Sequence, residues 1–501
     1  MKSVTNRYLP EKYSIIQGKQ SNVALCTCWS DPELLLKTHP RLTDVFSIIG
    51  TLYSTEGVSI LLRNLCLNPH IDTVFVWTNS RLSNTAIGKA GKELLQSLWE
   101  QGIARVAKEN ENLLHQELQI AVIKKVVQHV TLLTPESNDI ERVMKQAQSR
   151  HSSSLQAYME PVSFPEPSRD TYETMPSENV GWSLRGKTTI NAWLAVVDRI
   201  MRYGSTKKTE YGNNQKELQS VVWTITEDDT TTFSHPHWPR EVKTRIGLEK
   251  NMLEQYKSIF TTAEKEAESA YTYGSRLFTF PQNIDQIAFI IDKLRACRYS
   301  RRAFATTYCP AVDTHHTSPP CLTSIQFLSH GDRLNLFATF RSHDICKAAL
   351  PNVYGLLALQ EHVAHESGFH VGSLTIHSIS AHMYEEDWLM AHDLLSCAKW
   401  GRVKLYFDET TDIEPRGNVR ISLRNKKIHA ELIDAKGTAL FTYADTSARR
   451  IAMKFARLDL FSLTTHYVDI SIELTKAEIA LHREQSYIQD KPLIFDGVVI
   501  K

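Results

Sequence analysis

The first hundred residues alternate short apolar runs with longer amphipathic stretches. Apolar runs at 22–28 and 73–78 predict buried strands, and the periodic stretches at 57–66 and 82–100 predict helices. Strands that alternate with helices form a parallel sheet with helices packed on its faces. Residues 1–130 are therefore expected to form an α/β domain, whose role the sequence leaves open.

A polar stretch separates that domain from a second one. Residues 131–180 are rich in Ser, Pro, Glu and Gln, which is typical of a linker. The amphipathic pattern at 188–203 then predicts a helix, with Thr188 or Thr189 as its cap and Gly204 as its stop. We expect this helix to open a domain that spans residues 181–398.

The last hundred residues show the two-residue alternation of short strands, followed by two helical patterns. Strands are predicted at 402–408, 419–424, 427–433 and 439–443, and helices at 445–458 and 472–484. Residues 399–501 are therefore expected to form a small α+β appendage, again without an assigned role.

Composition and charge give few global clues to partners. At 501 residues the chain is long enough for two or three domains, and its net charge of +1 gives no reason to expect nucleic-acid binding. No apolar run reaches the ~18 residues that a membrane-spanning helix needs, and residues 1–10 lack the apolar core of a secretory signal. We expect a cytoplasmic protein without a membrane partner.

The cysteines are scattered along the chain, without the spacing of a metal site or a disulfide framework. Cys26 and Cys28 form the only close pair, and no second pair or histidine cluster follows it, which favours buried thiols over a metal role. Four histidines in predicted loops lack carboxylate partners suggestive of a metal site: His235, His237, His315 and His316. We therefore expect reduced thiols and no metal.

One cysteine follows two prolines at the start of a predicted hairpin. The alternation predicts strands at 322–329 and 333–342, and the His-Gly-Asp sequence at 330–332 is a turn signal. Cys321 then begins one strand and Arg341 ends the other, so the two are expected to be neighbours. A guanidinium favours the nucleophilic thiolate and also binds phosphate through two parallel donors.

Short motifs precede and follow this hairpin in a fixed order. They are Glu217-Leu218, Tyr273-Gly274, Tyr299-Ser300-Arg301-Arg302, Pro320-Cys321, Gln326-Phe327, Arg341-Ser342-His343-Asp344, Leu350-Pro351-Asn352 and His382-Met383-Tyr384. In order and spacing, residues 181–395 resemble the thymidylate synthase and dCMP hydroxymethylase family. The resemblance implies a layered mixed sheet with helices for this domain, so the fold class expected for the chain is α+β, with extra N- and C-terminal modules.

The resemblance also implies roles for individual side chains. Cys321 would be the nucleophile, Glu217 would organise water for proton transfers, and Arg341 would bind phosphate beside the thiol. The further substrate contacts implied are Arg301, Arg302, Ser342, Asp344, Asn352, His382 and Tyr384. Arg301 and Arg302 would reach the phosphate bound by a partner subunit, which implies a homodimer.

Three of these residues also have ordinary structural interpretations. Asn352 would pair with N3 and O4 of uracil, but it is also placed to cap a helix predicted at 353–366. His382 and Tyr384, two apart on a predicted strand, share a face and would hold one sugar hydroxyl. Glu217 without its context would be a solvated helix residue. The resemblance further places Lys207 or Lys208 in a phosphate-binding loop.

The reaction implied is reductive methylation of dUMP to dTMP, in which Cys321 adds to C6 and C5 then attacks a methylene carbon. 5,10-Methylenetetrahydrofolate would supply both carbon and hydride, so neither flavin nor metal is required. Two departures leave alternatives open. Residues 347–349 lack the glycine that lies under the folate, and the chain runs past the point where the family's own terminal residues close the site. The alternatives are a related tetrahydropterin carrier, a hydroxymethylase acting on dUMP or dCMP, and a non-catalytic nucleotide-binding protein.

Overall fold

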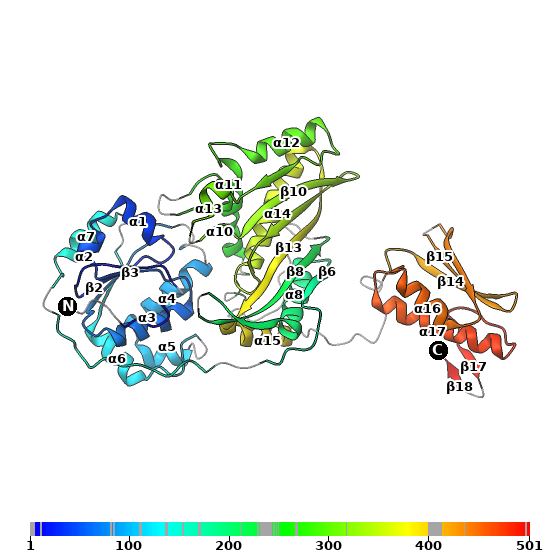
Figure 1. Ribbon diagram of the computed structural model, residues 1–501, viewed down its shortest axis with the longest axis horizontal. Helices are drawn as coiled ribbons and strands as arrows, with labels where there is room; N and C mark the ends of the chain where they lie inside the picture. Colours follow the sequence, from blue (N-terminus) through cyan, green and yellow to red (C-terminus); the bar gives the residue numbers. More distant parts are fainter. Residues whose placement is uncertain are drawn as a thin grey trace. The chain divides into compact units, whose positions relative to one another are not determined.

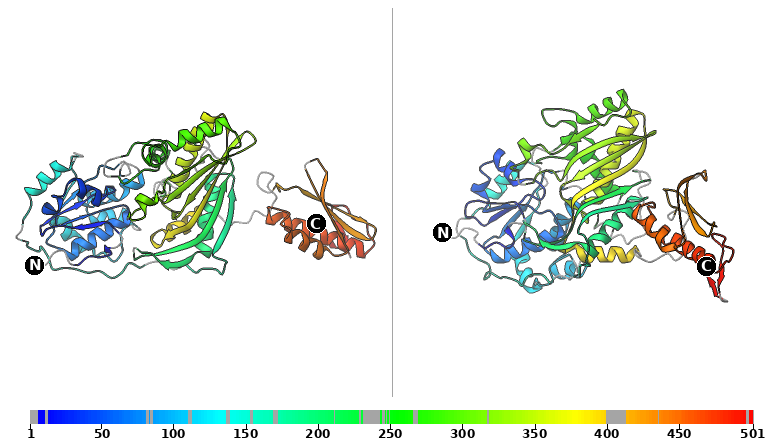
Figure 2. Two further views of the ribbon diagram at one scale, coloured as in Figure 1. Left: turned by 45° about the horizontal axis from the view of Figure 1, so that its top comes forward. Right: turned by 45° about the vertical axis from the view of Figure 1, so that its right-hand side comes forward.

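The chain divides into two compact units in a computed structural model, residues 1–401 and 402–501. Figures 1 and 2 trace the ribbon from several directions. The residues that the structure describes are 6–10, 13–80, 83, 86–109, 113–135, 139–152, 155–168, 172–210, 212–227, 230, 243, 246, 248, 250–265, 269–316, 318–398, 413–434, 436–495 and 498–500.

A five-stranded sheet forms the centre of the N-terminal domain, in the order β1-β3-β2-β4-β5. β1 pairs antiparallel with β3 at one edge, and the other pairs are parallel. Helices α1, α2 and α7 pack on one face and α3 to α6 on the other (Figure 1), which confirms an α/β layer. The bounds are β1 Ile15–Gln17, β2 Val23–Cys26, α1 Pro32–Thr38, α2 Leu42–Val45, β3 Ile48–Gly50, α3 Thr55–Leu67, β4 Thr73–Val76, α4 Ala86–Gln101, α5 Ile103–Glu109 and α6 Ile120–His129.

The N-terminal domain extends into the segment expected to be a linker. β5 (Thr131–Leu133) continues the parallel sheet beside β4, and α7 (Ile140–Gln148) buries Ile140, Val143 and Met144 in the same core. The described residues between 149 and 179 contain no helix or strand. The expected linker at 131–180 is therefore too long at its start, because a three-residue strand and a short amphipathic helix escaped a prediction based on composition.

A mixed sheet of eight strands organises the second domain, with the path β6-β8-β13-β11-β10-β9. β7 pairs with β8, and β12 pairs with β13. The layered mixed sheet with helices expected for this domain is confirmed. The strands are β6 Val180–Gly186, β7 Ser205–Lys208, β8 Asn214–Ile225, β9 Phe304–Thr306, β10 Leu322–His330, β11 Arg333–Phe340, β12 His343–Asp344 and β13 His370–Tyr384.

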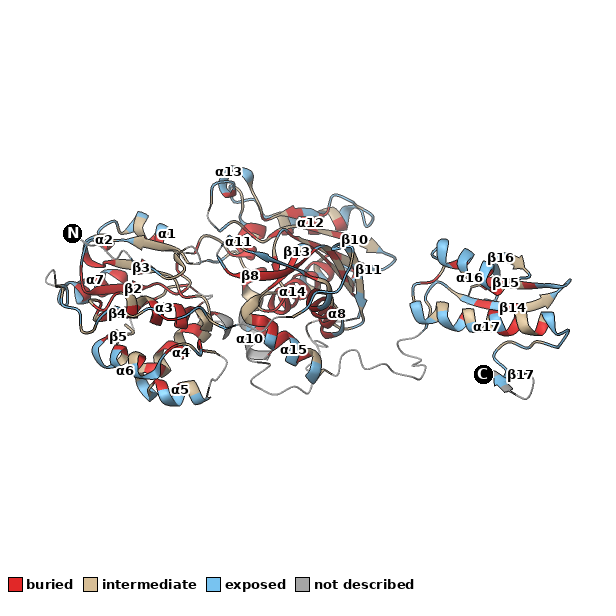
Figure 3. Cartoon of the chain, turned by 60° about the horizontal axis from the view of Figure 1, so that its bottom comes forward, coloured by how far each residue is buried: buried red, intermediate tan, exposed pale blue. Residues whose placement is uncertain are grey.

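Helices α8 and α14 supply much of the core against this sheet. α14 is apolar on nearly every side, as expected of a helix buried all round, and Figure 3 shows buried residues along it and the neighbouring strands. It ends at Gly368, whose φ of 72° suits a left-handed cap. The helices of this domain are α8 Thr189–Tyr203, α10 Lys250–Thr261, α11 Tyr273–Phe278, α12 Gln286–Ala296, α13 Pro310–Asp313, α14 Ala349–Ser367, η3 Glu385–Asp387 and α15 Trp388–Cys397.

The second unit is a three-stranded antiparallel sheet, in the order β14-β15-β16, with two helices packed on it. This is the small α+β fold expected, although α17 begins before the predicted residue 472 and the predicted strand 402–408 lies outside the described residues. The elements are β14 Asn418–Arg424, β15 Lys427–Ile433, β16 Ala439–Asp445, α16 Ala448–Arg457, α17 Thr464–His482, and the hairpin β17 Leu493–Phe495 and β18 Val498–Ile500.

Candidate active site around Cys321

The hairpin of β10 and β11 brings Cys321 and Arg341 together. Leu322 pairs with Phe340, and the Arg341 backbone N–H donates to the Cys321 carbonyl at 2.9 Å. The predicted neighbourhood is confirmed. The Arg341 guanidinium donates from Nε to the Pro320 carbonyl (3.0 Å) and from Nη2 to the Pro319 carbonyl (2.8 Å). Arg341 therefore also holds the two prolines that precede the cysteine.

The thiol of Cys321 is held mainly in its protonated form. Burial raises the pKa of Cys321, whereas the Arg341 guanidinium lowers it and the Asp344 carboxylate raises it again. Arg341 acts in the expected direction, but the expected thiolate is not favoured because desolvation outweighs the guanidinium. The proton must leave, or the site must become more polar, before the sulfur can attack.

Three tyrosines lie close enough to Cys321 for its charge to affect their ionisation: Tyr256, Tyr271 and Tyr273. Burial raises the pKa of each phenol, and a Cys321 thiolate would raise it further. All three therefore stay protonated and can donate hydrogen bonds. Sequence reasoning missed Tyr256 and Tyr271, since no short motif surrounds them, and noticed Tyr273 only as part of its Tyr-Gly pair.

Asn352 lies inside α14 and does not cap it. The helix begins at Ala349, and Asn352 is only 2% exposed. Its Oδ1 accepts from the Tyr256 hydroxyl at 3.0 Å, and its Nδ2 contacts Nε2 of His343 at 3.5 Å. The capping interpretation is therefore wrong. His343 belongs to a motif visible in the sequence, but no role had been attached to it.

Strand register aligns Glu217, His382 and Asp344 across the sheet. His382 on β13 pairs with Glu217 on β8 and, on the other side, with Asp344 on β12. Ser380 links the first two residues, because its hydroxyl bonds to the Glu217 carboxylate and contacts Nδ1 of His382 at 3.3 Å. Asp344 accepts the backbone N–H groups of Cys346 (3.0 Å) and Lys347 (2.9 Å).

Glu217 lies on a buried strand and is only 4% exposed, so the helix expected around it is wrong. Burial acts to raise the pKa of its carboxyl, but hydrogen bonds from Lys207, Ser380 and Gln219 outweigh burial and lower the pKa. Lys207 also forms an ion pair with it. Glu217 is therefore an ionised carboxylate beside His382. Alternation does not reveal this strand at Glu217, because Gln215 to Leu218 are buried without interruption and β8 alternates only from Ser220 onward.

His382 and Tyr384 share one end of β13, as expected for residues two apart on a strand. Their rings meet edge to face with centroids 5.2 Å apart. Burial lowers the pKa of His382 to about 4, so the imidazole is neutral near pH 7. The Lys347 ammonium lies 5.4 Å from the Tyr384 ring and pairs with Asp387 at 2.8 Å.

Arg301 and Arg302 are exposed in the turn between α12 and the edge strand β9. The Arg301 carbonyl accepts from the Gln326 amide at 3.0 Å, and the Arg302 N–H donates to the Ser300 hydroxyl at 3.2 Å. These bonds hold the backbone and leave both guanidinium groups exposed. Ser342 lies in the bend after β11. Their phosphate roles stay predictions.

Within the described ranges, no helix is long and apolar enough to cross a membrane, and no group of three or more His, Cys, Asp or Glu side chains is arranged to hold a metal ion. His235 and His237 lie outside the described residues. Cys26 and Cys28 are both buried free thiols, as expected.

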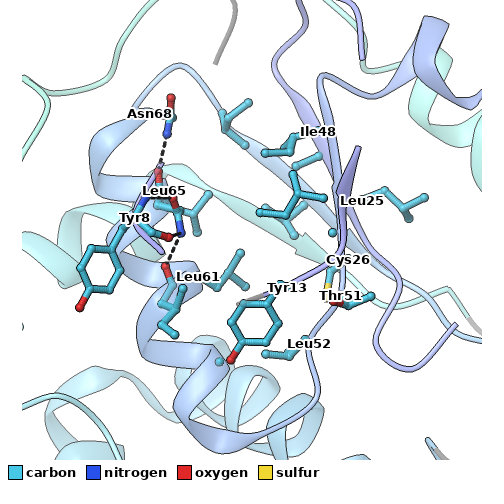
Figure 4. A pocket seen from close by; sticks show the side chains of 18 of the residues that line it. Tyr8, Tyr13, Leu25, Cys26, Ile48, Thr51, Leu52, Leu61, Leu65 and Asn68 are labelled. Carbon is cyan, nitrogen blue, oxygen red and sulfur yellow. Dashed lines mark hydrogen bonds between the residues drawn. The ribbon is translucent and has the colours of Figure 1, made fainter. Parts of the chain in front are cut away.

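A separate cavity of about 100 Å³ lies in the N-terminal domain. Side chains of the sheet and of α3 surround it, and Tyr8 and Tyr13 lie at its edge (Figure 4). Every lining residue falls between positions 8 and 74, so this cavity is not part of the Cys321 site.

The mixed sheet and the Cys321 site match one family of proteins. The family model described as Thymidylate synthase matches residues 191–434, which includes most of the sheet and continues into the second unit. This match indicates the class of protein: residues 191–434 are similar to enzymes of the thymidylate synthase fold.

Individual relatives make the family assignment specific. A protein of Methanosarcina barkeri is 33% identical over 216 residues, which are 95% of that protein and 43% of this chain. One of Methanothermobacter marburgensis is 35% identical over 209 residues (93% and 40%), and one of Methanothermobacter thermautotrophicus is 33% identical over 227 (100% and 44%). Each carries the name "Putative thymidylate synthase". The chain belongs to the thymidylate synthase family, and more than half of it lies outside these matches.

Proposed function

We propose that the protein methylates dUMP at C5 to give dTMP, with a methylene-tetrahydropterin as carbon and hydride donor. The observation that carries the proposal is that one side chain, Tyr256, connects the surroundings of Cys321 with the Asn352 amide. Tyr256 hydrogen-bonds to Asn352 at 3.0 Å and lies within the electrostatic reach of Cys321. A pyrimidine whose N3 and O4 edge pairs with Asn352 would then present its ring to the sulfur.

In this mechanism the Cys321 sulfur attacks C6 of the bound nucleotide once its proton has left. The carbon–sulfur bond forms, the C5=C6 electron pair moves toward C4, and charge collects on O4, where Asn352 donates a hydrogen bond. C5 becomes the nucleophile toward the methylene carbon. When the C5 proton leaves, Glu217 is the ionised carboxylate assigned to receive it through water. Loss of that proton would let the bond from the methylene carbon to the donor's nitrogen break. Hydride from the donor would then add to the freed methylene carbon, and the sulfur would leave C6 as it adds, which regenerates Cys321.

The remaining side chains bind the nucleotide away from the reacting carbons. Arg341 and Ser342, with Arg301 and Arg302 from a second subunit, are assigned to the phosphate, because guanidinium groups match phosphate oxygens. His382 and Tyr384 are assigned to the sugar hydroxyl. Asp344, on β12, is assigned to the substrate as a further contact. Neutral His382 can donate through one ring nitrogen and accept through the other.

Where the one-carbon carrier would bind, the sequence differs from the family at Ala348, which replaces a glycine. Its backbone has a φ of −101° and a ψ of −26°, an ordinary right-handed conformation that needs no glycine. The difference from the family's glycine is therefore one methyl group at a half-buried position, without a change of backbone conformation. When bound, 5,10-methylenetetrahydrofolate or a related tetrahydropterin supplies the one-carbon unit and the hydride.

A homodimer is part of the proposal. The side chains of β11 alternate between buried and half-buried, which leaves one face of the sheet partly uncovered in the single chain. Arg301 and Arg302 are exposed near the sheet edge, and the proposal assigns neither of them to the active site of its own subunit. A second copy of the chain packed against this face accounts for both features.

The test is to incubate the protein with dUMP or dCMP and labelled methylene-tetrahydrofolate or its methanopterin counterpart, and to identify the product by mass. We expect a methylated uracil nucleotide together with the oxidised dihydro carrier, and none from Cys321→Ser. A hydroxymethyl product would replace the proposed reaction with hydration of the same intermediate. Full activity in Cys321→Ser would exclude covalent catalysis by this residue.

A further inference from the structure

The carboxamide of Asn352 is held from both sides by residues of other elements. Tyr256, on α10, donates its hydroxyl to Oδ1 at 3.0 Å. His343, on β12, faces Nδ2 through its Nε2 at 3.5 Å. Both contacts form inside the domain core, where Asn352 is 2% and His343 1% exposed. Both contacts are therefore largely shielded from water, which strengthens them.

His343 is itself fixed in position and charge. Its ring stacks on Phe340 with centroids 4.0 Å apart and planes 5° apart, and its Nδ1 lies 2.8 Å from the Ser378 hydroxyl. Ser378 also accepts from Trp223 Nε1 at 3.2 Å. Burial lowers the pKa of His343 to about 3, so the ring is neutral under ordinary conditions. A neutral imidazole has one nitrogen that accepts, and Nε2 can fill that role toward Asn352 if Nδ1 carries the proton.

After these two contacts, the Asn352 amide can still form further hydrogen bonds with a ligand. A carboxamide has two acceptor lone pairs on its oxygen and two N–H donors. Tyr256 occupies one lone pair and His343 one N–H, so one acceptor and one donor remain for a ligand. Uracil presents an N3–H donor beside the O4 acceptor, which complements that remainder. Cytosine presents the reverse, an N3 acceptor beside an amino donor.

We propose that Tyr256 and His343 clamp Asn352 in the orientation that reads uracil, and so set the preference for uracil over cytosine nucleotides. The proposal rests on the proposed function, because it takes Asn352 as the base-reading residue. Both clamp residues are positioning residues that act through Asn352. To bind cytosine, the amide must turn over, which places Oδ1 against the lone pair of His343 Nε2. That contact is relieved only if the imidazole also changes tautomer and Ser378 turns its proton toward Nδ1.

The test is the ratio of affinities for dUMP and dCMP, measured by calorimetry, together with the ratio of kcat/KM. Tyr256→Phe removes the hydroxyl and keeps the ring, so the amide loses one of its two anchors. We expect the dUMP-to-dCMP ratio to fall about tenfold, which corresponds to the loss of one buried hydrogen bond. Tyr354→Phe is the matched control, since Tyr354 lies on α14 like Asn352 but donates to Glu254 instead. The control should keep the wild-type ratio.

A second variant tests the other side of the clamp without touching Asn352. Ser378→Ala removes the partner of His343 Nδ1 and frees the ring to change tautomer, so the ratio should again fall while the thermal unfolding midpoint shows that the fold is retained. An unchanged ratio in both folded variants would overturn the clamp and leave the methylation proposal standing. Wild-type preference for dCMP would also overturn it. Wild-type protein that binds neither nucleotide would overturn both proposals together.

Discussion

Acid should destabilise the second domain through His382. The imidazole is 3% exposed, and burial lowers its pKa from an ordinary 6.5 to about 4. In the unfolded chain it takes up a proton as pH falls through about 6.5, whereas the folded chain resists protonation down to about pH 4. The pKa of His382 is therefore lower in the folded chain than in the unfolded chain. Its contribution to the unfolding free energy is complete at neutral pH and is lost as the pH falls from about 6.5 to about 4.

The size of this loss follows from the two pKa values. Acidification from about pH 7.5 to about pH 5 removes ~2 kcal/mol of unfolding free energy through His382 alone. His382→Gln should lack this component, so its unfolding free energy should fall by ~2 kcal/mol less than that of the wild type over the same interval. His370→Gln is the matched control, because His370 lies on the same strand and its side chain is 78% exposed.

The assay must report on this domain alone, since a chain of several domains need not unfold in one step. Cys346 is a suitable probe because it is fully buried in the core of the second domain. The protein is equilibrated in urea at each pH and given a short alkylation pulse at one common pH, and labelling at Cys346 is quantified by mass spectrometry. Parallel stability curves for the wild type and His382→Gln would refute a buried neutral histidine at this position.

Two further predictions concern the nucleophile and the dimer. Arg341→Met should raise the pKa of the Cys321 thiol further and slow its alkylation by iodoacetamide about tenfold at neutral pH, because a guanidinium that lowers the pKa is lost. Cys321→Ser measures the background labelling. An unchanged alkylation rate would show that Arg341 does not lower the pKa of the thiol. Mixing Cys321→Ser with Arg302→Ala, each inactive alone, should restore roughly a quarter of wild-type activity. About half of randomly formed dimers contain one subunit of each variant, and one of the two sites in such a dimer has both intact residues. If no activity returns after subunit exchange, Arg302 acts in the site of its own subunit.

Local patterns in the sequence predicted the parts of the site that depend on local geometry. The prolines before Cys321, the alternation on both strands and the turn between them placed Cys321 beside Arg341, and the structure has this pair. The spacing of His382 and Tyr384 likewise put both rings on one face of β13. In each case the relevant residues share one strand or one hairpin, so strand periodicity is sufficient.

Other features depend on which distant segments meet. Glu217 seemed a helix residue until the pairing of β8 with β13 placed it opposite His382 in a buried strand. β5 was too short to stand out from a polar segment, yet pairing with β4 makes it part of the sheet. A strand's partner and register are set by packing over the whole sheet, which no local window contains.

The sequence by itself determined the mixed α+β domain, the Cys321–Arg341 hairpin and the set of residues that mark the family. The tertiary structure decided how those residues behave. Burial raises the pKa of Cys321 despite its arginine, and the packing of α10 and β12 around α14 gives Asn352 the partners Tyr256 and His343. The physical reason is that desolvation and hydrogen-bond partnership depend on neighbours brought together by folding, whereas periodicity and turn chemistry are properties of the chain itself.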